Sequence, residues 1–278
     1  MSTGRLLVVD ADPAVHELLR PALGRAGTVQ DAYNGQEAFA QLKSLAWDVV
    51  VASQDRNGFE NVSRLLRRVR AVRPEARVIV TGDPDPRRVI DAIRARAFSY
   101  FHKPLAPTPV ADMVQQALQA SAWQDDIRVV SARPEWITLE IRCKFGANER
   151  ATQFLREMQP DLPAGIRDDV AVAFRELLMN AIEHGGKSDP HKRVRVSLLR
   201  TPTALIGHVQ DPGAGFSLDA VPHAAICNPE DSPTRHVEVR LEQGQRPGGF
   251  GILMTRNMVD ELLYNERGNA VLFVKHLK

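Results

Sequence analysis

The chain has 278 residues, of which 44% are hydrophobic and 25% are charged, a composition typical of globular proteins that excludes a disordered or fibrous chain. A net charge of +2 gives no reason to expect a nucleic-acid partner. Two cysteines are too few for a disulfide framework, and no apolar run reaches the ~20 residues needed to span a bilayer. We therefore expect a cytoplasmic protein of one or two domains with neither membrane nor nucleic acid as a direct partner.

Residues 1–122 alternate short β-branched runs with longer amphipathic segments. Strands are predicted at 6–9, 28–31, 48–52, 77–80 and 97–101. Helices are predicted at 13–23, 35–45, 60–72, 86–94 and 108–122. Strands that are apolar throughout and separated by helices favour a doubly wound α/β domain, with a five-stranded parallel sheet covered on both faces.

The pattern changes after Trp123, where residues 123–136 are interpreted as a linker and residues 137–278 as a second domain. The predicted elements are strands at 137–144, 193–200 and 203–210, helices at 148–158, 166–183 and 251–262, and a closing hairpin that turns at Gly268-Asn269. Residues 212–248 form a long proline-rich loop, a length typical of functional lids. This half predicts a two-layer α/β sandwich with its helices on one face of the sheet.

The order of elements over residues 4–122 resembles the receiver domains of two-component response regulators. That resemblance implies a phosphoryl-accepting Asp after the third strand and an acidic pair after the first strand that holds Mg²⁺. It also implies a Thr or Ser after the fourth strand and a Lys-Pro after the fifth, and Thr81 and Lys103-Pro104 match these positions.

Other positions depart from the receiver pattern. The acidic pair falls on Asp10 and Ala11, and the phosphoacceptor position holds Ser53. Mg²⁺ requires several oxygen ligands, and two of the carboxylates that would supply them are missing. We therefore expect a pseudo-receiver that serves as a docking or dimerising module; the alternative is that Asp55 replaces Ser53 as the acceptor.

In the second half, Glu176, Asn180 and His184 recur at helical spacing along the edge of an apolar stripe. Asn180 can offer Mg²⁺ a neutral oxygen, and Glu176 can accept a proton from a hydroxyl group or water. Taken alone, this row is explained better as the solvated flank of a helix. The nearby HGGKS segment, residues 184–188, is no phosphate loop, because it follows a helix and Ala181 stands where that loop needs glycine.

Two glycine-containing segments follow in the chain. Asp211 ends a predicted strand and can accept a hydrogen bond from an exocyclic amine, while Gly213 and Gly215 permit close backbone approach. The second segment begins a helix, where free N–H groups suit phosphate. Its glycines are Gly248, Gly249 and Gly251.

In this order, the motifs resemble the Bergerat-type ATP-binding fold, which is shared by histidine kinases, gyrase-type ATPases, Hsp90 chaperones and anti-sigma factor serine kinases. The sequence NAIEH at residues 180–184 is similar to the corresponding motif of the anti-sigma factor kinases. The resemblance implies ATP and Mg²⁺ as cofactors, Glu176 as general base, Asn180 as the metal-holding residue and Asp211 as the adenine-reading residue. It further implies that the glycines of both segments bind or gate the triphosphate, and that His184 orients it or contacts phosphate.

We therefore expect a degenerate receiver fused to an ATP-dependent Ser/Thr protein kinase, whose partner is a STAS-domain anti-sigma antagonist or a sigma factor-like regulatory protein. The alternative is a non-catalytic switch that binds ATP and sequesters a regulator. A histidine kinase is disfavoured because no histidine lies between His102 and His184. A homodimer is expected from the same resemblance.

Overall fold

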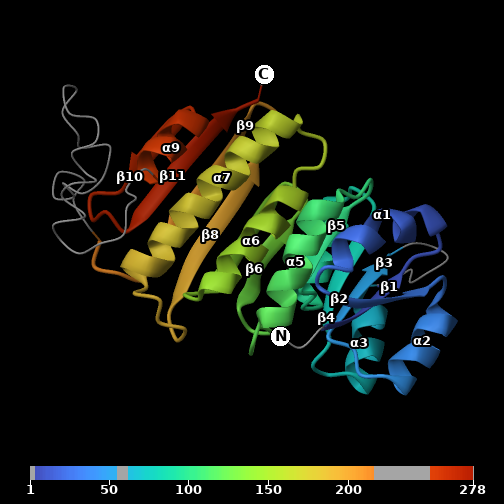
Figure 1. The fold of residues 1–278 in the computed structure, drawn as a ribbon. Coiled ribbons are helices and arrows are strands. Elements are labelled where there is room, and N and C mark those ends of the chain that lie inside the picture. Colours follow the sequence, from blue (N-terminus) through green and yellow to red (C-terminus); the bar gives the residue numbers. More distant parts are fainter. Residues whose placement is uncertain (1–3, 55–61, 216–250, 278) are drawn as a thin grey trace. The chain divides into compact units, whose positions relative to one another are not determined.

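The computed structural model describes residues 4–54, 62–215 and 251–277. Backbone packing divides the chain into two units, each with its own sheet (Figure 1). The first unit contains Met1–Arg128 and Gln153–Asp161, and the second contains Val129–Thr152 and Leu162–Lys278. No helix within the described ranges combines the length and apolar character that crossing a membrane requires.

The sheet of the first unit is parallel, with strand order β2-β1-β3-β4-β5. Its strands are β1 (Gly4–Val9), β2 (Gly27–Ala32), β3 (Val49–Ser53), β4 (Arg77–Gly82) and β5 (Ser99–His102). Its helices are α1 (Pro13–Leu23), α2 (Gly35–Ser44), α3 (Val62–Val72), α4 (Pro86–Arg94) and α5 (Pro107–Gln119). Helix α1 packs against α5, while α3 packs against α2 and α4, so the two groups cover opposite faces. The predicted doubly wound fold is confirmed.

Local chemistry explains where three of these helices begin. The side chains of Asp12, Asn34 and Asp85 accept hydrogen bonds from backbone N–H groups in the first turns of α1, α2 and α4. These N–H groups have no partner within the helix, and capping residues of this type supply one. The helix starts, and with them the loops at the carboxyl ends of the strands, are therefore fixed locally.

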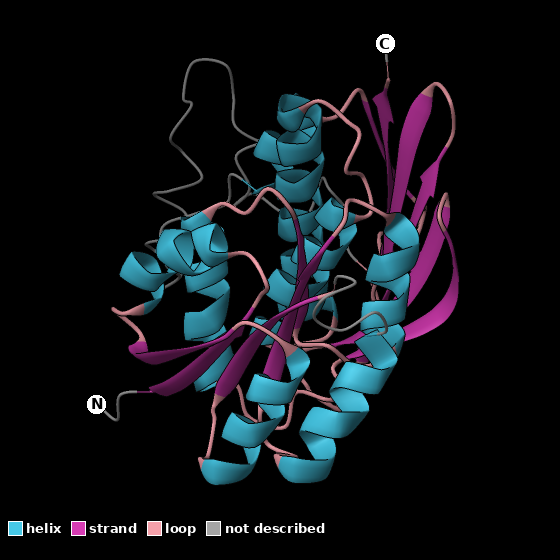
Figure 2. Ribbon diagram, turned by 90° about the vertical axis from the view of Figure 1, so that its right-hand side faces the viewer, coloured by secondary structure: helices cyan, strands magenta, loops and turns pink. Residues whose placement is uncertain are grey.

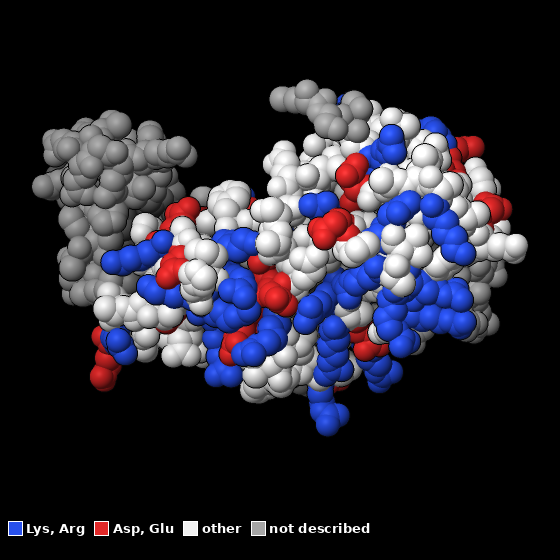
Figure 3. All heavy atoms as spheres, turned by 90° about the horizontal axis from the view of Figure 1, so that it is seen from below, with Lys and Arg blue, Asp and Glu red and all other residues white. Residues whose placement is uncertain are grey.

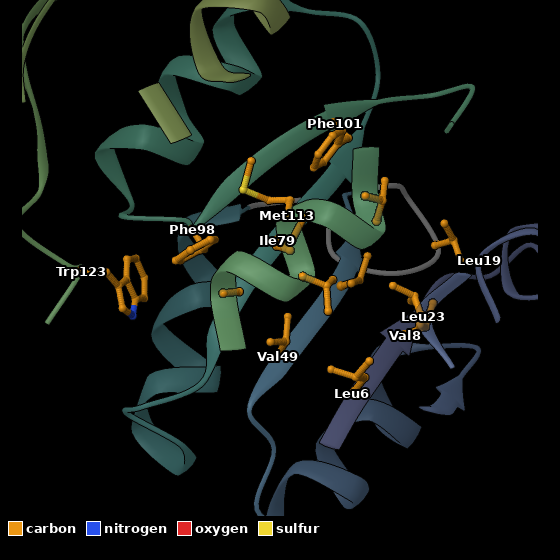
Figure 4. Close-up of a cluster of buried hydrophobic side chains, with 14 residues drawn as sticks. Leu6, Val8, Leu19, Leu23, Val49, Ile79, Phe98, Phe101, Met113 and Trp123 are labelled. Atoms are coloured by element: carbon orange, nitrogen blue, oxygen red, sulfur yellow. The ribbon is translucent and has the colours of Figure 1, made fainter. Parts of the chain in front are cut away.

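The core between the sheet and helices α1 and α5 comes from the β-branched runs and the apolar faces of the two helices (Figure 4). Phe98 and Trp123 meet edge to face, with ring centroids 5.3 Å apart. The fully or nearly buried members are Leu6, Val8, Leu19, Leu23, Val49, Val51, Ile79, Phe98, Phe101, Val110, Met113, Val114, Ala117 and Trp123.

The second sheet has six strands in the order β10-β11-β9-β8-β7-β6. Its strands are β6 (Ile127–Arg133), β7 (Trp136–Arg142), β8 (Arg193–Arg200), β9 (Ala204–Gln210), β10 (Glu261–Tyr264) and β11 (Ala270–His276). The neighbouring strands β7 and β8, β8 and β9, β9 and β11, and β11 and β10 pair antiparallel. Helices α6 (Phe145–Glu157), α7 (Ala164–Asn180) and α9 (Gly251–Met258) lie along one face of the sheet (Figures 1 and 2).

Alternation along the strands explains this layering. Ile137, Leu139 and Ile141 of β7 are buried, as are Val194, Val196 and Leu198 of β8, whereas the residues between them are more exposed. The buried stripe of α7 packs on this side, and Phe174 meets Phe273 of β11 edge to face at 5.2 Å between ring centroids. The predicted α/β architecture with helices on one face is confirmed.

Three local predictions are wrong. Strand β6 (Ile127–Arg133) lies inside the segment interpreted as a linker, because a turn at Pro134-Glu135 lets it form a hairpin with β7. The helix predicted at 251–262 ends at Met258, and Glu261 begins β10, which pairs with β11. The helix predicted at 166–183 becomes a π-helix, η1 (Ala181–Gly185), after Asn180.

Candidate functional site

The first part of the candidate site joins helices α7 and α9. Glu176 and Asn180 lie one turn apart on α7, and both side chains face Gly251 at the start of α9. A Cβ atom at residue 251 would lie 2.8 Å from Oε2 of Glu176 and 3.7 Å from Nδ2 of Asn180. Only glycine leaves room there for the carboxylate and the α9 backbone to approach.

The second part joins the end of β9 to the end of η1. The Asp211 side chain lies against Gly185, where a Cβ atom would overlap its carboxylate. The backbone N–H of Gly213 donates to Oδ1 of Asp211 at 2.6 Å, and a Cβ at residue 213 would also crowd Gly185. Two glycines separated in sequence thus make a niche for one carboxylate. Gly215 has a positive φ of 87°, a conformation in which glycine carries no Cβ penalty.

The half-buried Asp211 has a perturbed acidity. Burial raises its pKa, while the Gly213 N–H and the positive charge of Arg267 oppose that rise. Nearby, burial raises the pKa of the Cys143 thiol to about 11, with smaller contributions from neighbouring charges that include Asp211. A partly desolvated carboxylate at the end of a strand is suited to accept a hydrogen bond from a bound ligand.

The π-helical turn lies between these two parts. The N–H of Gly186 donates to the carbonyl of Ala181 at 2.8 Å, which is the wider i→i+5 spacing. This turn shifts His184 out of α-helical register with Asn180, and the His184 side chain is exposed. Glu176 and Asn180 thus precede the π-helical turn in the chain, and Asp211 packs against Gly185 at its end, whereas the role of His184 stays a prediction.

Two predicted site residues, Gly248 and Gly249, lie outside the described residues, as does most of the predicted lid. Among the residues that the structure does describe, no group of three or more His, Cys, Asp or Glu side chains could hold a metal ion. The metal-holding role assigned to Asn180 therefore stays a prediction.

In the first unit, the polar residues at the carboxyl ends of the strands pair with one another or with nearby backbone groups. Nζ of Lys103 lies 2.6 Å from Oδ2 of the buried Asp10. Ser53 and Thr81 are register partners on β3 and β4, and both are buried. Asp12, which could have supplied a further carboxylate, caps α1 by accepting from the N–H of Ala14.

This arrangement agrees with the interpretation of a pseudo-receiver. The buried carboxylate pairs with an ammonium group, and Ser53 supplies a hydroxyl where the receiver pattern needs a carboxylate. The alternative acceptor, Asp55, lies outside the described residues.

Arginines cluster on α3, and many Lys and Arg side chains gather on the face seen in Figure 3. Several have structural partners, because Arg70 donates to the carbonyl of Arg96 and Arg73 donates to those of Leu45 and Lys43. The guanidinium of Arg68 lies 4.7 Å from the ring centroid of Phe39. These contacts favour the interpretation of α3 as a helix with a solvated face whose arginines also contact neighbouring elements.

Sequence reasoning missed the residues that hold the Asp211 loop in place. They lie in the β10–β11 turn, where Asn269 accepts a backbone hydrogen bond from Asp211 and Arg267 donates to the carbonyl of Ala214. The only sequence signal was the Gly268-Asn269 pair, which indicates a turn and not what that turn contacts.

Each half of the chain matches the model of a known protein family. Residues 6–115 match the family model described as a response regulator receiver domain. Residues 146–275 match the model described as a histidine kinase-like ATPase domain. Both resemblances inferred from the sequence are therefore confirmed at the level of the domain.

Two curated proteins are similar to the chain. The DNA-binding transcriptional regulator NtrC of Azospirillum brasilense is 28% identical over 213 residues, which cover 74% of this chain and 43% of that protein. The hydrogenase transcriptional regulatory protein HoxA of Cupriavidus necator is 30% identical over 124 residues, which cover 44% of this chain and 26% of that protein. The chain thus spans less than half the length of either relative.

Solved receiver structures also match part of the chain. A response regulator from Thermotoga maritima is 27% identical and covers 42% of this chain and 99% of its own, with a TM-score of 0.39. The BeF3-activated DrrB receiver domain is 24% identical, with the same two coverages and a TM-score of 0.38.

Proposed function

Since the chain is a signal-transduction regulator that joins a receiver domain to a histidine kinase-like ATPase domain, we propose that it phosphorylates a Ser or Thr hydroxyl group on a partner protein. The partner is a STAS-domain anti-sigma antagonist or a sigma factor-like regulatory protein. The observation that carries the proposal is the approach of Glu176 and Asn180 to Gly251, because it gathers a proton acceptor and a metal-type ligand at the start of a helix.

The niche fits an adenine nucleotide in its chemistry. Gly185 and Gly213 leave room around Asp211 that a Cβ atom would fill, and the carboxylate can accept a hydrogen bond from an exocyclic amine. Asn180 supplies one amide oxygen, and Mg²⁺ in nucleotide sites commonly takes one or two protein ligands besides phosphate and water. Bound ATP supplies the phosphoryl group that is transferred.

Glu176 does the acid–base work in this proposal. Its Oε2 atom, which faces Gly251, accepts the proton that the partner's hydroxyl group loses. Its other oxygen, Oε1, lies 3.7 Å from Nη1 of Arg175. Asn180 orients the phosphate end of the nucleotide, and Asp211 orients its base.

The receiver domain has a different task in this proposal. Asp10 is paired with Lys103, and the fully buried Ser53 supplies a hydroxyl group in place of a carboxylate, so the domain acts as a docking module without accepting a phosphoryl group. Its surface then brings the regulatory partner to the kinase or conveys an input to it.

The test incubates the full chain with γ-labelled ATP and candidate partner proteins that carry a STAS domain. We expect label on the partner, and a loss of about 10²–10⁴ in transfer rate for Glu176→Gln with ATP affinity retained. The matched control is Glu135→Gln, an exposed carboxylate in the β6–β7 turn, which should transfer at the wild-type rate.

One result would reject the kinase proposal, and another would reject only the role of Glu176. If ATP and partner both bind but no label moves, the chain is a nucleotide-dependent switch that sequesters its partner. If Glu176→Gln transfers label as fast as Glu135→Gln, Glu176 is not the general base of the reaction, and another group must accept the proton.

A further inference from the structure

The turn between β10 and β11 holds the loop that carries Asp211. The N–H of Asp211 donates to the carbonyl of Asn269 at 3.0 Å. On the other side of the turn, Nε of Arg267 donates to the carbonyl of Ala214 at 3.2 Å, and Gly215 packs so closely that a Cβ atom there would overlap the Arg267 carbonyl. Both ends of the Asp211–Gly215 loop therefore rest on one turn.

This turn is itself fixed by local hydrogen bonds. Oδ1 of Asn265 accepts from the N–H groups of Asn269 and Ala270, each at 3.0 Å, while its Nδ2 donates to the side chain of Asn269. Gly268 takes a positive φ of 72° and donates to the carbonyl of Asn265. An Asn side chain that bonds backbone groups a few residues on is a standard way to order a turn. The backbone of Arg267 is thus held in one place.

Arg267 also acts on Asp211 through its charge. Among the described residues, Arg267 is the ionisable side chain that acts on the half-buried carboxylate, and it favours the ionised form against desolvation. Other ionisable groups in the described part of this region are the Cys143 thiol after β7, on which Asp189, Lys192 and Asp211 act, and the exposed Glu183 and His184 before Gly185. The thiol stays neutral below its pKa of about 11.

We propose that Arg267 is a positioning residue for nucleotide binding, which holds the Asp211–Gly215 loop in place so that the Asp211 carboxylate recognises an adenine ring. The inference rests on the proposed function in one respect, namely that the base of the nucleotide contacts Asp211. It adds a residue that touches neither base nor phosphate and acts through two contacts, one to a backbone carbonyl and one electrostatic.

The test measures the dissociation constant of a nonhydrolysable ATP analogue from the ordinary aspartate pKa of 3.8 up to about pH 8, since the pKa of Asp211 is raised from that value. We expect affinity to fall on the acidic side, with a midpoint at higher pH in Arg267→Ala than in wild type. At the wild-type midpoint, the variant should bind about 2- to 5-fold more weakly, the effect of one exposed charge pair. Titration of the nucleotide is common to both proteins and cancels in the comparison.

Two further variants separate charge from position. Arg267→Lys keeps the charge but not the Nε donor to Ala214, so its midpoint should stay close to wild type while its affinity falls at every pH. Arg133→Ala, an exposed arginine on β6, should match wild type throughout. High salt should bring Arg267→Ala and wild type closer together, because exposed charges are screened.

An unchanged midpoint and affinity in Arg267→Ala would overturn this inference and leave the proposed function intact. If wild type binds no ATP analogue at any pH, both are overturned. Far-ultraviolet circular dichroism on each variant ensures that a loss of binding is not a loss of fold.

Discussion

Lys103 and Asp10 form an ion pair in which Nζ lies 2.6 Å from Oδ2, with the aspartate side chain 2% exposed and the lysine side chain 31% exposed. A carboxylate this deeply buried needs a compensating charge, and Lys103 supplies it from the end of β5. The residues at these two positions match the receiver pattern, but Ser53 stands where that pattern needs the aspartate that accepts a phosphoryl group.

Removal of the lysine should therefore destabilise the receiver domain. We expect Lys103→Ala to lower the free energy of unfolding by about 1–3 kcal/mol, less than for a fully buried pair because water reaches the ammonium group. Urea unfolding followed by circular dichroism measures this change. The control is Asp125→Asn, which removes one partner of the exposed Arg96–Asp125 pair and should cost less than about 0.5 kcal/mol. Equal effects of the two variants would mean that Asp10 is solvated after all.

The receiver domain should also fail to accept a phosphoryl group from a small donor. With acetyl phosphate and Mg²⁺, we expect no covalent label on the wild-type chain, since a serine hydroxyl at position 53 cannot form an acyl phosphate. Intact mass spectrometry measures the added mass. A label that appears in wild type and disappears in Asp55→Asn would instead identify Asp55 as the acceptor.

Gly185 gives a steric test of the nucleotide niche. A methyl group at residue 185 would overlap the Asp211 carboxylate, so Gly185→Ala should displace that side chain and reduce ATP affinity about 10-fold or more, the loss of one charge-assisted hydrogen bond. Gly165→Ala is the matched control, because a Cβ there meets nothing within 4 Å. Isothermal titration calorimetry should show wild-type affinity for the control. Wild-type affinity in Gly185→Ala would place the nucleotide elsewhere.

Much of both folds could be predicted from local patterns. The apolar runs and amphipathic segments of the first half each became a strand or helix, since period and capping are encoded within a few residues. The strand β6 was hidden because Pro134 and the charged residues near it resemble a linker, and a hairpin partner is revealed only by pairing. Strand β10 was predicted as the end of the preceding helix, because its pairing with β11 is likewise not visible in the local pattern.

In the candidate site, too, some residues could be predicted from local sequence and others only from tertiary contacts. Glu176, Asn180 and Asp211 belong to motifs with fixed spacing, so the sequence alone could single them out. The contact between Arg267 and Ala214 spans 53 positions and depends on how the β10–β11 turn meets the end of β9. No local period encodes such a contact, and the exposed arginine resembled any other surface charge. Spacing identified the candidate binding residues, and only the tertiary structure identified the contact of Arg267 with the Asp211 loop.

Asp211 should stabilise nucleotide binding at the expense of the stability of the free protein. Because burial raises its pKa above the ordinary 3.8, the folded chain holds this proton more tightly than the unfolded chain does. The contribution of Asp211 to stability is therefore lost as pH rises from 3.8 through the higher folded-state pKa, where the carboxylate must ionise in a desolvated niche.

Asp211→Asn removes that ionisation and leaves an amide of nearly the same size. In the absence of nucleotide, we expect the variant to match or exceed the stability of wild type near neutral pH and to lose this advantage at pH values below 3.8. ATP affinity should nevertheless fall by about 1.5–3 kcal/mol, the scale of a hydrogen bond to a charged group. Urea unfolding at the two pH values and calorimetric titration measure the two effects. Asp168→Asn, an exposed carboxylate on α7, serves as the control and should leave ATP affinity unchanged. A variant that binds ATP as tightly as wild type would show that the Asp211 carboxylate does not read the base, because a role confined to holding the loop would survive the exchange of one oxygen for an amide nitrogen.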